Sequence, residues 1–270
     1  MPTDYRGGFP THWTVRGEGD RDAVLIHCSL AHQGAWKGVE EPLTPWLRMT
    51  AFDIPGHGRS ANWDGRGDYQ AVTTAMAADL IDGRADLVGH SFGATVALRL
   101  AIEQPEKVRS LTMIEPVFFA VLQGQNVPGS GEHEAEYRRV IDALDRGQPE
   151  QAASLFVGEW GAGVPWDALP ETQRNYATAR IGQIRDTEPQ IYHDRAGLTR
   201  RLPMLDLPVL ILDGTRSPAI MSAICAKLHS RIRGAMRHRI EGAGHMLPIT
   251  HPGPAAECIA EFLHLGSSRE

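Results

Sequence analysis

The sequence predicts an α/β fold, in which a mostly parallel sheet is covered by helices on both faces and interrupted by a helical insertion. Short apolar runs recur along the chain with helix-period segments between them, which is typical of strands buried on both sides. From about residue 117 to residue 205 the apolar runs disappear, and the sequence is rich in charged residues with a helical pattern. A chain of 270 residues is long enough for one large domain that carries such an insertion.

The apolar runs place the strands, and the segments between them place the helices. Strands are expected at Ala23–Ile26, Met49–Phe52, Ala85–Val88, Leu111–Ile114, Val209–Leu212 and around Met236–Ile240. Asp68 is expected to cap a helix that stops at Gly83. A second helix runs from Phe92 to Pro105, and a third occupies Ala255–Leu263.

The insertion divides the chain into a core and a cap. Residues 1–116 and 206–270 are predicted to form the core, and residues 117–205 a helical cap. A strand restarts after Leu207 and Pro208, and two strand and helix units follow. The cap is therefore expected to interrupt the sheet rather than to follow it.

Composition and charge exclude several function classes. The net charge is -6 and the arginines are scattered, so nothing in the sequence attracts a nucleic acid. No stretch approaches the length of a membrane span, and the first residues lack a signal-peptide pattern, which favours a cytoplasmic protein without membrane contact. The twelve histidines include no HExxH pattern and the three cysteines no CxxC pair, so no metal, other cofactor or disulfide framework is predicted.

The strongest chemical signal is the pentapeptide GHSFG at residues 89–93, between a predicted strand and a predicted helix. This is the pattern of a nucleophile elbow, whose tight turn needs small residues on both sides of the serine and holds its hydroxyl above the sheet edge. Ser91 is therefore the candidate nucleophile. The helix that starts at Phe92 offers a backbone N–H and a favourable dipole to a developing oxyanion.

A serine nucleophile needs a general base from elsewhere in the fold. His245 is the best candidate, because it lies in the loop GAGHM directly after the last predicted strand. The competing histidines are His27, His32, His57 and His90. His90 adjoins Ser91, but a side chain next to a nucleophile cannot readily turn back to contact it.

Four motifs together resemble the α/β-hydrolase superfamily, in particular its bacterial capped members. They are HCSL at 27–30 followed by Trp36, DIPGHGRS at 53–60, GHSFG at 89–93 and GAGHM at 242–246. Their order matches the family order across the whole core. The resemblance implies an α/β-hydrolase fold, an oxyanion hole formed by the backbone N–H groups of Ser29 and Phe92, and a cap over the site.

Two residues depart from the family pattern. Cys28 stands where the family usually has glycine, and a nucleophilic role for it is a weaker alternative, because small buried cysteines are mostly packing residues. Ser217 stands where the family commonly places its acid after the penultimate strand. Some members carry the acid one strand earlier, which makes Glu115 the first candidate. Asp213 is the rival acid, and a third interpretation has Glu115 merely facing solvent or capping the next turn.

Aromatic residues near the predicted site suggest a substrate pocket. The pocket is predicted to include Trp36, Phe118, Phe119, Trp160 and Met246. Other aromatic residues of the cap either line the same cavity or form the cap's own core: Tyr137, Phe156, Trp166, Tyr176 and Tyr192.

The leading functional hypothesis is a serine hydrolase that cleaves a small, largely apolar ester or lactone through an acyl-enzyme. Carbon–carbon bond hydrolysis of a diketone-like substrate is an alternative that uses the same residues. A dehalogenase or an epoxide hydrolase needs an aspartate at the elbow, so Ser91 argues against both. A ligand-binding protein without turnover is the alternative from another class, because the usual acid is missing. The expected partner is a small-molecule substrate, and the oligomeric state is left open.

Overall fold

The structure is a computed structural model that describes residues 3–266, and it contains one sheet of eight strands. The strands follow the order β1-β2-β4-β3-β5-β6-β7-β8. They are β1 (Thr3–Arg6), β2 (Phe9–Arg16), β3 (Arg21–Ile26), β4 (Leu47–Phe52), β5 (Ala85–His90), β6 (Val108–Ile114), β7 (Val209–Gly214) and β8 (Met236–Ile240). Pairing is antiparallel from β1 through β2 to β4 and parallel from β4 to β8, which confirms the predicted mostly parallel sheet.

All six predicted strands are present, and five of them extend two or three residues beyond the predicted run at one end. Strands β1 and β2 were not expected. β2 contains Pro10 and buries the polar side chains of Thr11, His12 and Thr14, so it does not read as an apolar run. Its burial comes from packing between strands and loops, which a local pattern does not show.

Helices cover both faces of the sheet, and alternate strand residues point to each layer. Val24 and Ile26 belong to the hydrophobic cluster that includes residues of α2, α3 and α9, whereas Ala23 and Leu25 pack with α1 and α11. The helices of the two layers and their connections are α1 (Lys37–Leu43), α2 (Tyr69–Asp79), α3 (Phe92–Glu103), α9 (Ala219–Arg231), α10 (Leu247–Thr250), α11 (Pro252–Phe262), η1 (Gln33–Trp36) and η2 (Pro105–Lys107). Asp68 caps α2 as predicted, since its carboxylate accepts the Ala71 N–H at 2.8 Å.

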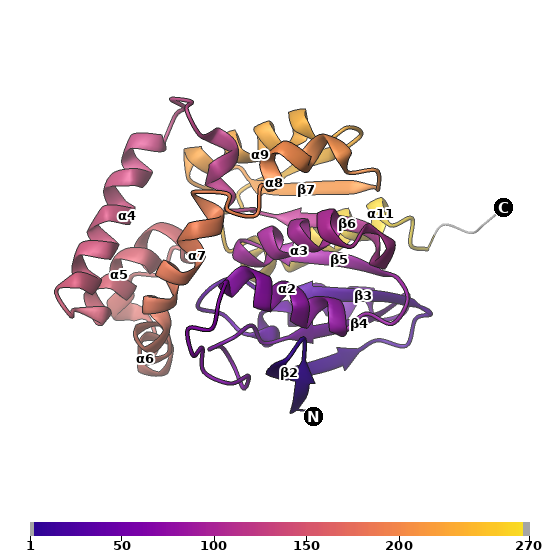
Figure 1. The fold of residues 1–270 in the computed structure, drawn as a ribbon, viewed down its shortest axis with the longest axis horizontal. Helices are drawn as coiled ribbons and strands as arrows, with labels where there is room; N and C mark the ends of the chain where they lie inside the picture. Colours follow the sequence, from indigo (N-terminus) through magenta and orange to yellow (C-terminus); the bar gives the residue numbers. More distant parts are fainter. Residues whose placement is uncertain (1–2, 267–270) are drawn as a thin grey trace.

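The segment between β6 and β7 contains helices joined by turns and no strand. They are η3 (Phe119–Leu122), α4 (Ser130–Asp145), α5 (Pro149–Trp160), η4 (Trp166–Ala168), α6 (Glu171–Arg180), η5 (Ile181–Gln183), α7 (Ile184–Ile191), α8 (Leu198–Arg201) and η6 (Leu202–Met204). Helices α4, α5 and α6 stand together beside the sheet in Figure 1 and share a small hydrophobic cluster around Val140 and Ala177. In contrast, η3 and residues Leu198 and Leu202 join the main core. No helix among residues 3–266 is long and apolar enough to cross a membrane.

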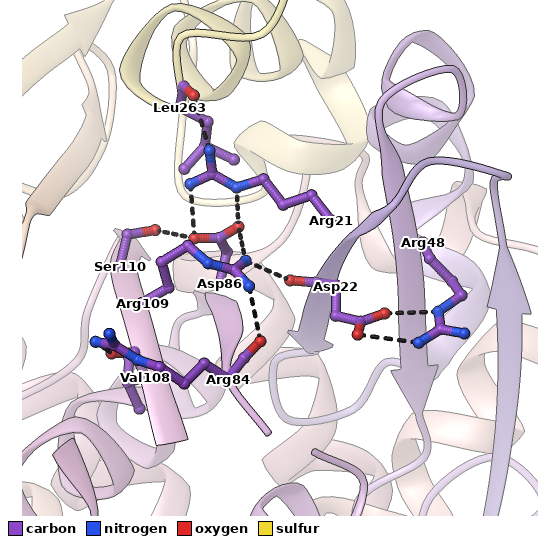
Figure 2. Close-up of polar contacts among 9 residues, drawn as sticks. All are labelled: Arg21, Asp22, Arg48, Arg84, Asp86, Val108, Arg109, Ser110 and Leu263. Carbon is purple, nitrogen blue, oxygen red and sulfur yellow. Dashed lines mark hydrogen bonds and ion pairs between the residues drawn. The ribbon is translucent and has the colours of Figure 1, made fainter. Parts of the chain in front are cut away.

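The amino edge of the parallel strands carries a buried carboxylate surrounded by cations (Figure 2). Asp86, in β5, is 1% exposed and accepts hydrogen bonds from Arg21 at 2.9 Å, from Arg109 at 3.1 Å and from Ser110 at 2.7 Å. Arg21 also donates to the Leu263 carbonyl after α11, at 3.0 Å. These contacts join β3, β5, β6 and the last helix at one end of the sheet.

Candidate active site

Ser91 lies in the sharp turn between β5 and α3. Its φ and ψ angles are 56° and -118°, a strained backbone conformation that is typical of functional turns. A Cβ atom on Gly93 would lie 2.1 Å from the Ile26 carbonyl oxygen, and one on Gly89 would lie 2.4 Å from the Gly93 carbonyl oxygen. Only glycine fits at either position, which explains why the elbow has glycines on both sides of the serine.

His245 comes from the loop after β8 and reaches the serine. Its Nε2 lies 3.0 Å from Ser91 Oγ, so the hydroxyl can donate to the ring. His90 instead donates from its Nε2 to the His245 carbonyl at 2.8 Å. Burial, together with the neighbouring His245, lowers the pKa of His90 to about 3, so His90 stays neutral and supports the backbone of His245.

Glu115 is the carboxylate that contacts His245. Its Oε2 lies 3.1 Å from His245 Nδ1, and its side chain is fully buried, which rules out the solvent-facing alternative. The other oxygen, Oε1, accepts the Gly214 N–H and the Ser217 hydroxyl, both at 2.6 Å. Ser217 therefore does not replace the acid but donates to it. This contact was missed in the sequence, although a hydroxyl at the family's acid position is a plausible donor to an acid on the neighbouring strand.

Asp213, the rival acid, is engaged elsewhere. Its carboxylate lies 2.7 Å from Arg237 and 3.1 Å from Arg239, both on β8, and it is fully buried. Arg237 also donates to Ser222 of α9 at 2.9 Å. No hydrogen bond joins Asp213 to His245 in the part of the chain that the structure describes.

The two residues expected to supply the oxyanion hole, Ser29 and Phe92, line a cavity together with Ser91. Phe92 is the first residue of α3, so its N–H precedes the helical hydrogen bonds. Ser29 belongs to the loop of residues 28–31 after β3, here called the oxyanion loop. Ser29, Phe92 and Ser91 line one small cavity of about 40 Å³. His27 holds the start of the loop, because its Nδ1 donates to the Cys28 carbonyl at 2.7 Å while its Nε2 accepts the Ile54 N–H at 3.1 Å.

Cys28 does not have the properties of a nucleophile. Its side chain is 3% exposed, and burial raises the pKa of its thiol to about 12. Because the thiolate is the reactive form, a thiol with such a pKa is inert at neutral pH. Cys28 therefore serves as a small buried residue of the oxyanion loop.

Two cavities meet at Ser91 and His245. The larger has a volume of about 700 Å³ and lies between the oxyanion loop, α5, α6 and the segment after His245. The smaller, the cavity of about 40 Å³, reaches from Ser91 under α4 and α7. Trp160 borders both cavities. The centroid of its ring lies 4.7 Å from the centroid of the His245 ring, in an edge-to-face arrangement. Most of the residues around both cavities are apolar.

Three of the five predicted pocket residues reach a cavity and two do not. Met246 lines the larger cavity, Phe119 the smaller one and Trp160 both. The prediction was wrong for Trp36 and Phe118, which are 1% and 0% exposed and pack in the hydrophobic core on opposite sides of the sheet. Position near a strand end does not determine which way a side chain points, and both rings turn inward.

The other aromatic residues of the segment between β6 and β7 divide between the cavities and a separate hydrophobic cluster. Tyr176 lines the larger cavity, Tyr137 and Tyr192 the smaller one, and Phe156 both, while Trp166 packs against the cluster around Val140 and Ala177.

His133 of α4, which the sequence did not single out, also borders the smaller cavity. Its Nε2 lies 2.7 Å from the Tyr192 hydroxyl and its Nδ1 3.0 Å from Glu159. Among residues 3–266 no group of three His, Cys, Asp or Glu side chains could hold a metal ion.

Comparison with known protein families decides the identity of the fold. Residues 23–257 match the model of the alpha/beta hydrolase family, a span that contains the elbow, His245 and Glu115. The chain belongs to the α/β hydrolase family. Two pimeloyl-[acyl-carrier protein] methyl ester esterases are similar over almost their whole length. The one from Yersinia pestis is 36% identical over 269 residues, covering 93% of this chain and 96% of the relative. The one from Methylococcus capsulatus is 30% identical over 256 residues, covering 90% and 94%.

Solved structures place the same fold in other α/β hydrolases. An enol-lactonase from Burkholderia xenovorans LB400 has a TM-score of 0.74 and 19% identity, covering 97% of this chain and 100% of that chain. A carboxylesterase from Bacillus subtilis has a TM-score of 0.72 and 18% identity, covering 94% and 88%. These comparisons confirm the predicted α/β-hydrolase fold and the prediction that the protein is a hydrolase.

Proposed function

We propose that Ser91, His245 and Glu115 form the catalytic triad of an esterase that acts through an acyl-enzyme. The observation that carries the proposal is one continuous line of hydrogen bonds, from Ser91 Oγ to His245 Nε2 at 3.0 Å and from His245 Nδ1 to Glu115 Oε2 at 3.1 Å. Such a line activates a serine, because the carboxylate fixes the ring tautomer and stabilises the imidazolium. A protein that only binds a ligand would have no need of it.

The proposed reaction follows from these contacts. Ser91 Oγ attacks the ester carbonyl while His245 Nε2 takes the hydroxyl proton, and the carbonyl oxygen becomes an oxyanion beside the N–H groups of Ser29 and Phe92. The tetrahedral intermediate collapses as His245 returns the proton to the leaving alcohol, which leaves an acyl group on Ser91. A water molecule, deprotonated by His245, then releases the carboxylic acid and restores the serine.

The unequal cavities support an ester with one small and one large part. The chamber of about 40 Å³ holds roughly three water molecules, since one water needs about 10–15 Å³ measured in this way. The cavity of about 700 Å³ accepts a much longer, largely apolar group. Because the similar Yersinia and Methylococcus proteins are methyl ester esterases, we place the small alcohol in the small chamber and the acyl chain in the large cavity. The segment of residues 117–205 acts in this proposal as the cap that encloses both.

Two isomeric esters test the assignment of the cavities. Methyl hexanoate and pentyl acetate have the same atoms but carry the small group on opposite sides of the ester. We expect kcat/KM to be at least tenfold higher for methyl hexanoate, and Ser91→Ala to hydrolyse neither. Equal rates would contradict the placement of the alcohol.

A second measurement tests the serine itself. A fluorophosphonate probe should label the folded protein at Ser91 and should not label Ser91→Ala. Failure of the folded protein to react would favour a binding protein without turnover.

A further inference from the structure

The oxyanion loop needs support from outside itself. Leu30 has a φ of 61°, in the left-handed region that costs a leucine roughly 1 kcal/mol or more. Leu30 directly follows Ser29, whose N–H is proposed to bind the oxyanion. A small rotation of the Leu30 backbone toward the more favourable region would turn that N–H away. Contacts that hold residues 30 and 31 therefore control the geometry of the oxyanion hole.

Two side chains make those contacts. The Leu30 N–H donates to His57 Nε2 at 3.0 Å, and the Ala31 carbonyl accepts the Tyr176 hydroxyl at 2.7 Å. The same hydroxyl accepts the Gly58 N–H at 2.8 Å. His57 and Gly58 belong to the neighbouring loop of the core, but Tyr176 comes from α6, on the other side of the large cavity. One hydroxyl group thus joins the insertion to two loops of the core.

The ring of Tyr176 is fixed independently of its hydroxyl. The Arg180 guanidinium lies 3.6 Å from the ring centroid, and Arg180 Nη1 donates to the Tyr176 carbonyl at 3.1 Å. The His32 ring meets it edge-on at 6.2 Å. Burial raises the pKa of the Tyr176 hydroxyl, which keeps it protonated and able to donate to Ala31 at neutral pH. Removing the hydroxyl should leave the ring where it is.

We propose that Tyr176 is a positioning residue, which holds the oxyanion loop from the cap so that the Ser29 N–H points at the developing oxyanion. The proposal rests on the proposed serine-esterase function and deepens it. Docking of α6 would complete the oxyanion hole, so the insertion contributes to the chemical step as well as to substrate binding. Tyr176 acts through the loop and does not touch the reacting atoms.

The test is Tyr176→Phe in the full chain, assayed with methyl hexanoate, the ester whose small alcohol suits the small chamber. Loss of a whole oxyanion-hole donor lowers kcat about 10²- to 10³-fold, so a donor that remains but is displaced should lower kcat about tenfold. KM should change less than twofold, because the ring and its stacking are kept. Ki for butylboronic acid, which forms a tetrahedral adduct on the serine, should rise by the same factor as kcat/KM falls.

A matched control separates positioning from general loosening of the insertion. Arg185→Leu removes hydrogen bonds from Arg185 of α7 to the Ile141 carbonyl and to Asp145 of α4, and neither bond involves Tyr176 or the oxyanion loop. We expect its kcat and its Ki for butylboronic acid to match those of the parent protein. Similar thermal unfolding of the two variants would show that Tyr176→Phe acts locally.

Each outcome gives a distinct answer. An unchanged kcat and Ki in folded Tyr176→Phe, or an equal loss in Arg185→Leu, would overturn the role of Tyr176. An active Ser91→Ala variant would instead overturn the proposed esterase mechanism. If Ser91→Ala is inactive while Tyr176→Phe behaves like the parent, only the positioning role is lost.

Discussion

The two ends of the parallel strands each contain a buried carboxylate, but only one of these two carboxylates is paired with arginines. At the amino edge, Asp86 is held by two arginines and a serine hydroxyl, so its charge is compensated (Figure 2). At the carboxyl edge, Glu115 accepts from the Gly214 N–H and the Ser217 hydroxyl and contacts a ring nitrogen of His245, and no arginine or lysine among residues 3–266 forms an ion pair with it. The comparison shows how one functional group serves two purposes: a carboxylate paired with arginines holds strands together, and one without them is available to a cation that forms during reaction.

Asp213 shows that position alone does not make the difference. It lies at the same carboxyl edge as Glu115, yet Arg237 and Arg239 of β8 compensate its charge as Arg21 and Arg109 compensate that of Asp86. The availability of a carboxylate therefore depends on its partners.

The largest effects are expected at the serine and its base. Ser91→Ala and His245→Ala should each lower kcat on the order of 10⁴-fold or more while circular dichroism shows an intact fold. The double variant should be no worse than either single variant, because the two groups act as one unit. A much slower double variant would indicate independent roles and would weaken the contrast between the two edges.

The next effect separates the two carboxylates of the carboxyl edge. Glu115→Gln should lower kcat roughly 10³- to 10⁴-fold, because an amide neither fixes the required tautomer nor stabilises the imidazolium. Asp213→Asn should keep kcat within about threefold of the parent and should instead lower the midpoint of urea unfolding. The reverse result would transfer the catalytic role to Asp213.

Acid should destabilise the carboxyl edge through its buried imidazoles. Burial lowers the pKa of His27 to about 4 and those of His57 and His90 to about 3, whereas unfolded histidine titrates near 6.5. The stabilisation that results from keeping these three histidines neutral is complete above pH 6.5. It is lost as the pH falls toward their native pKa values, because the unfolded chain then binds protons that the native protein excludes. Three such groups give a slope approaching about 4 kcal/mol per pH unit.

Glu40 contributes with the opposite sign. Burial raises its pKa to about 7, so its contribution is complete below pH 4.5 and is lost as the pH rises through 7. Because three histidines outweigh one glutamate, urea unfolding between pH 4.5 and 8 should show a stability that rises with pH up to about 7 and then levels off, with the rise above pH 6 made shallower by Glu40. A flat profile from pH 6.5 to 4.5 would contradict the neutral state of the buried histidines.

The smallest effect is expected at the amino edge. Asp86→Asn should lower the free energy of unfolding by about 2–3 kcal/mol, less than for a fully buried pair because both arginines are partly exposed. The folded variant should keep the parent kcat, since no residue of the active site contacts Asp86. A lower kcat in folded protein would show that the two edges are coupled.

Much of this arrangement could be predicted from order along the chain. Ser91, Glu115 and His245 each follow a predicted strand, and the carboxyl ends of parallel strands meet at one edge, so their proximity was expected. The structure places them in contact, and their catalytic roles stay a proposal. The ion pairs of Asp213 with Arg237 and Arg239 were not predicted. They depend on how β8 is aligned with β7, which the sequence does not show.

Contacts between distant segments could not be predicted. Tyr176 meets Ala31 across 145 residues of sequence, and no local pattern relates a cap tyrosine to a loop after the third strand. The wrong assignment of Trp36 and Phe118 has the same origin, since side-chain direction is decided by tertiary packing. β1 and β2 were missed because their pairing, rather than their own composition, makes them strands.

The contact between Trp160 and His245 gives the active site an internal optical reporter. An imidazolium quenches indole fluorescence at close range, whereas a neutral imidazole does so much less, and the two rings are 4.7 Å apart. The fluorescence difference between the parent and Trp160→Phe, followed across pH, therefore records the charge on His245 in the resting enzyme. Protonation of the ring that the proposed mechanism uses can therefore be followed without substrate, label or inhibitor.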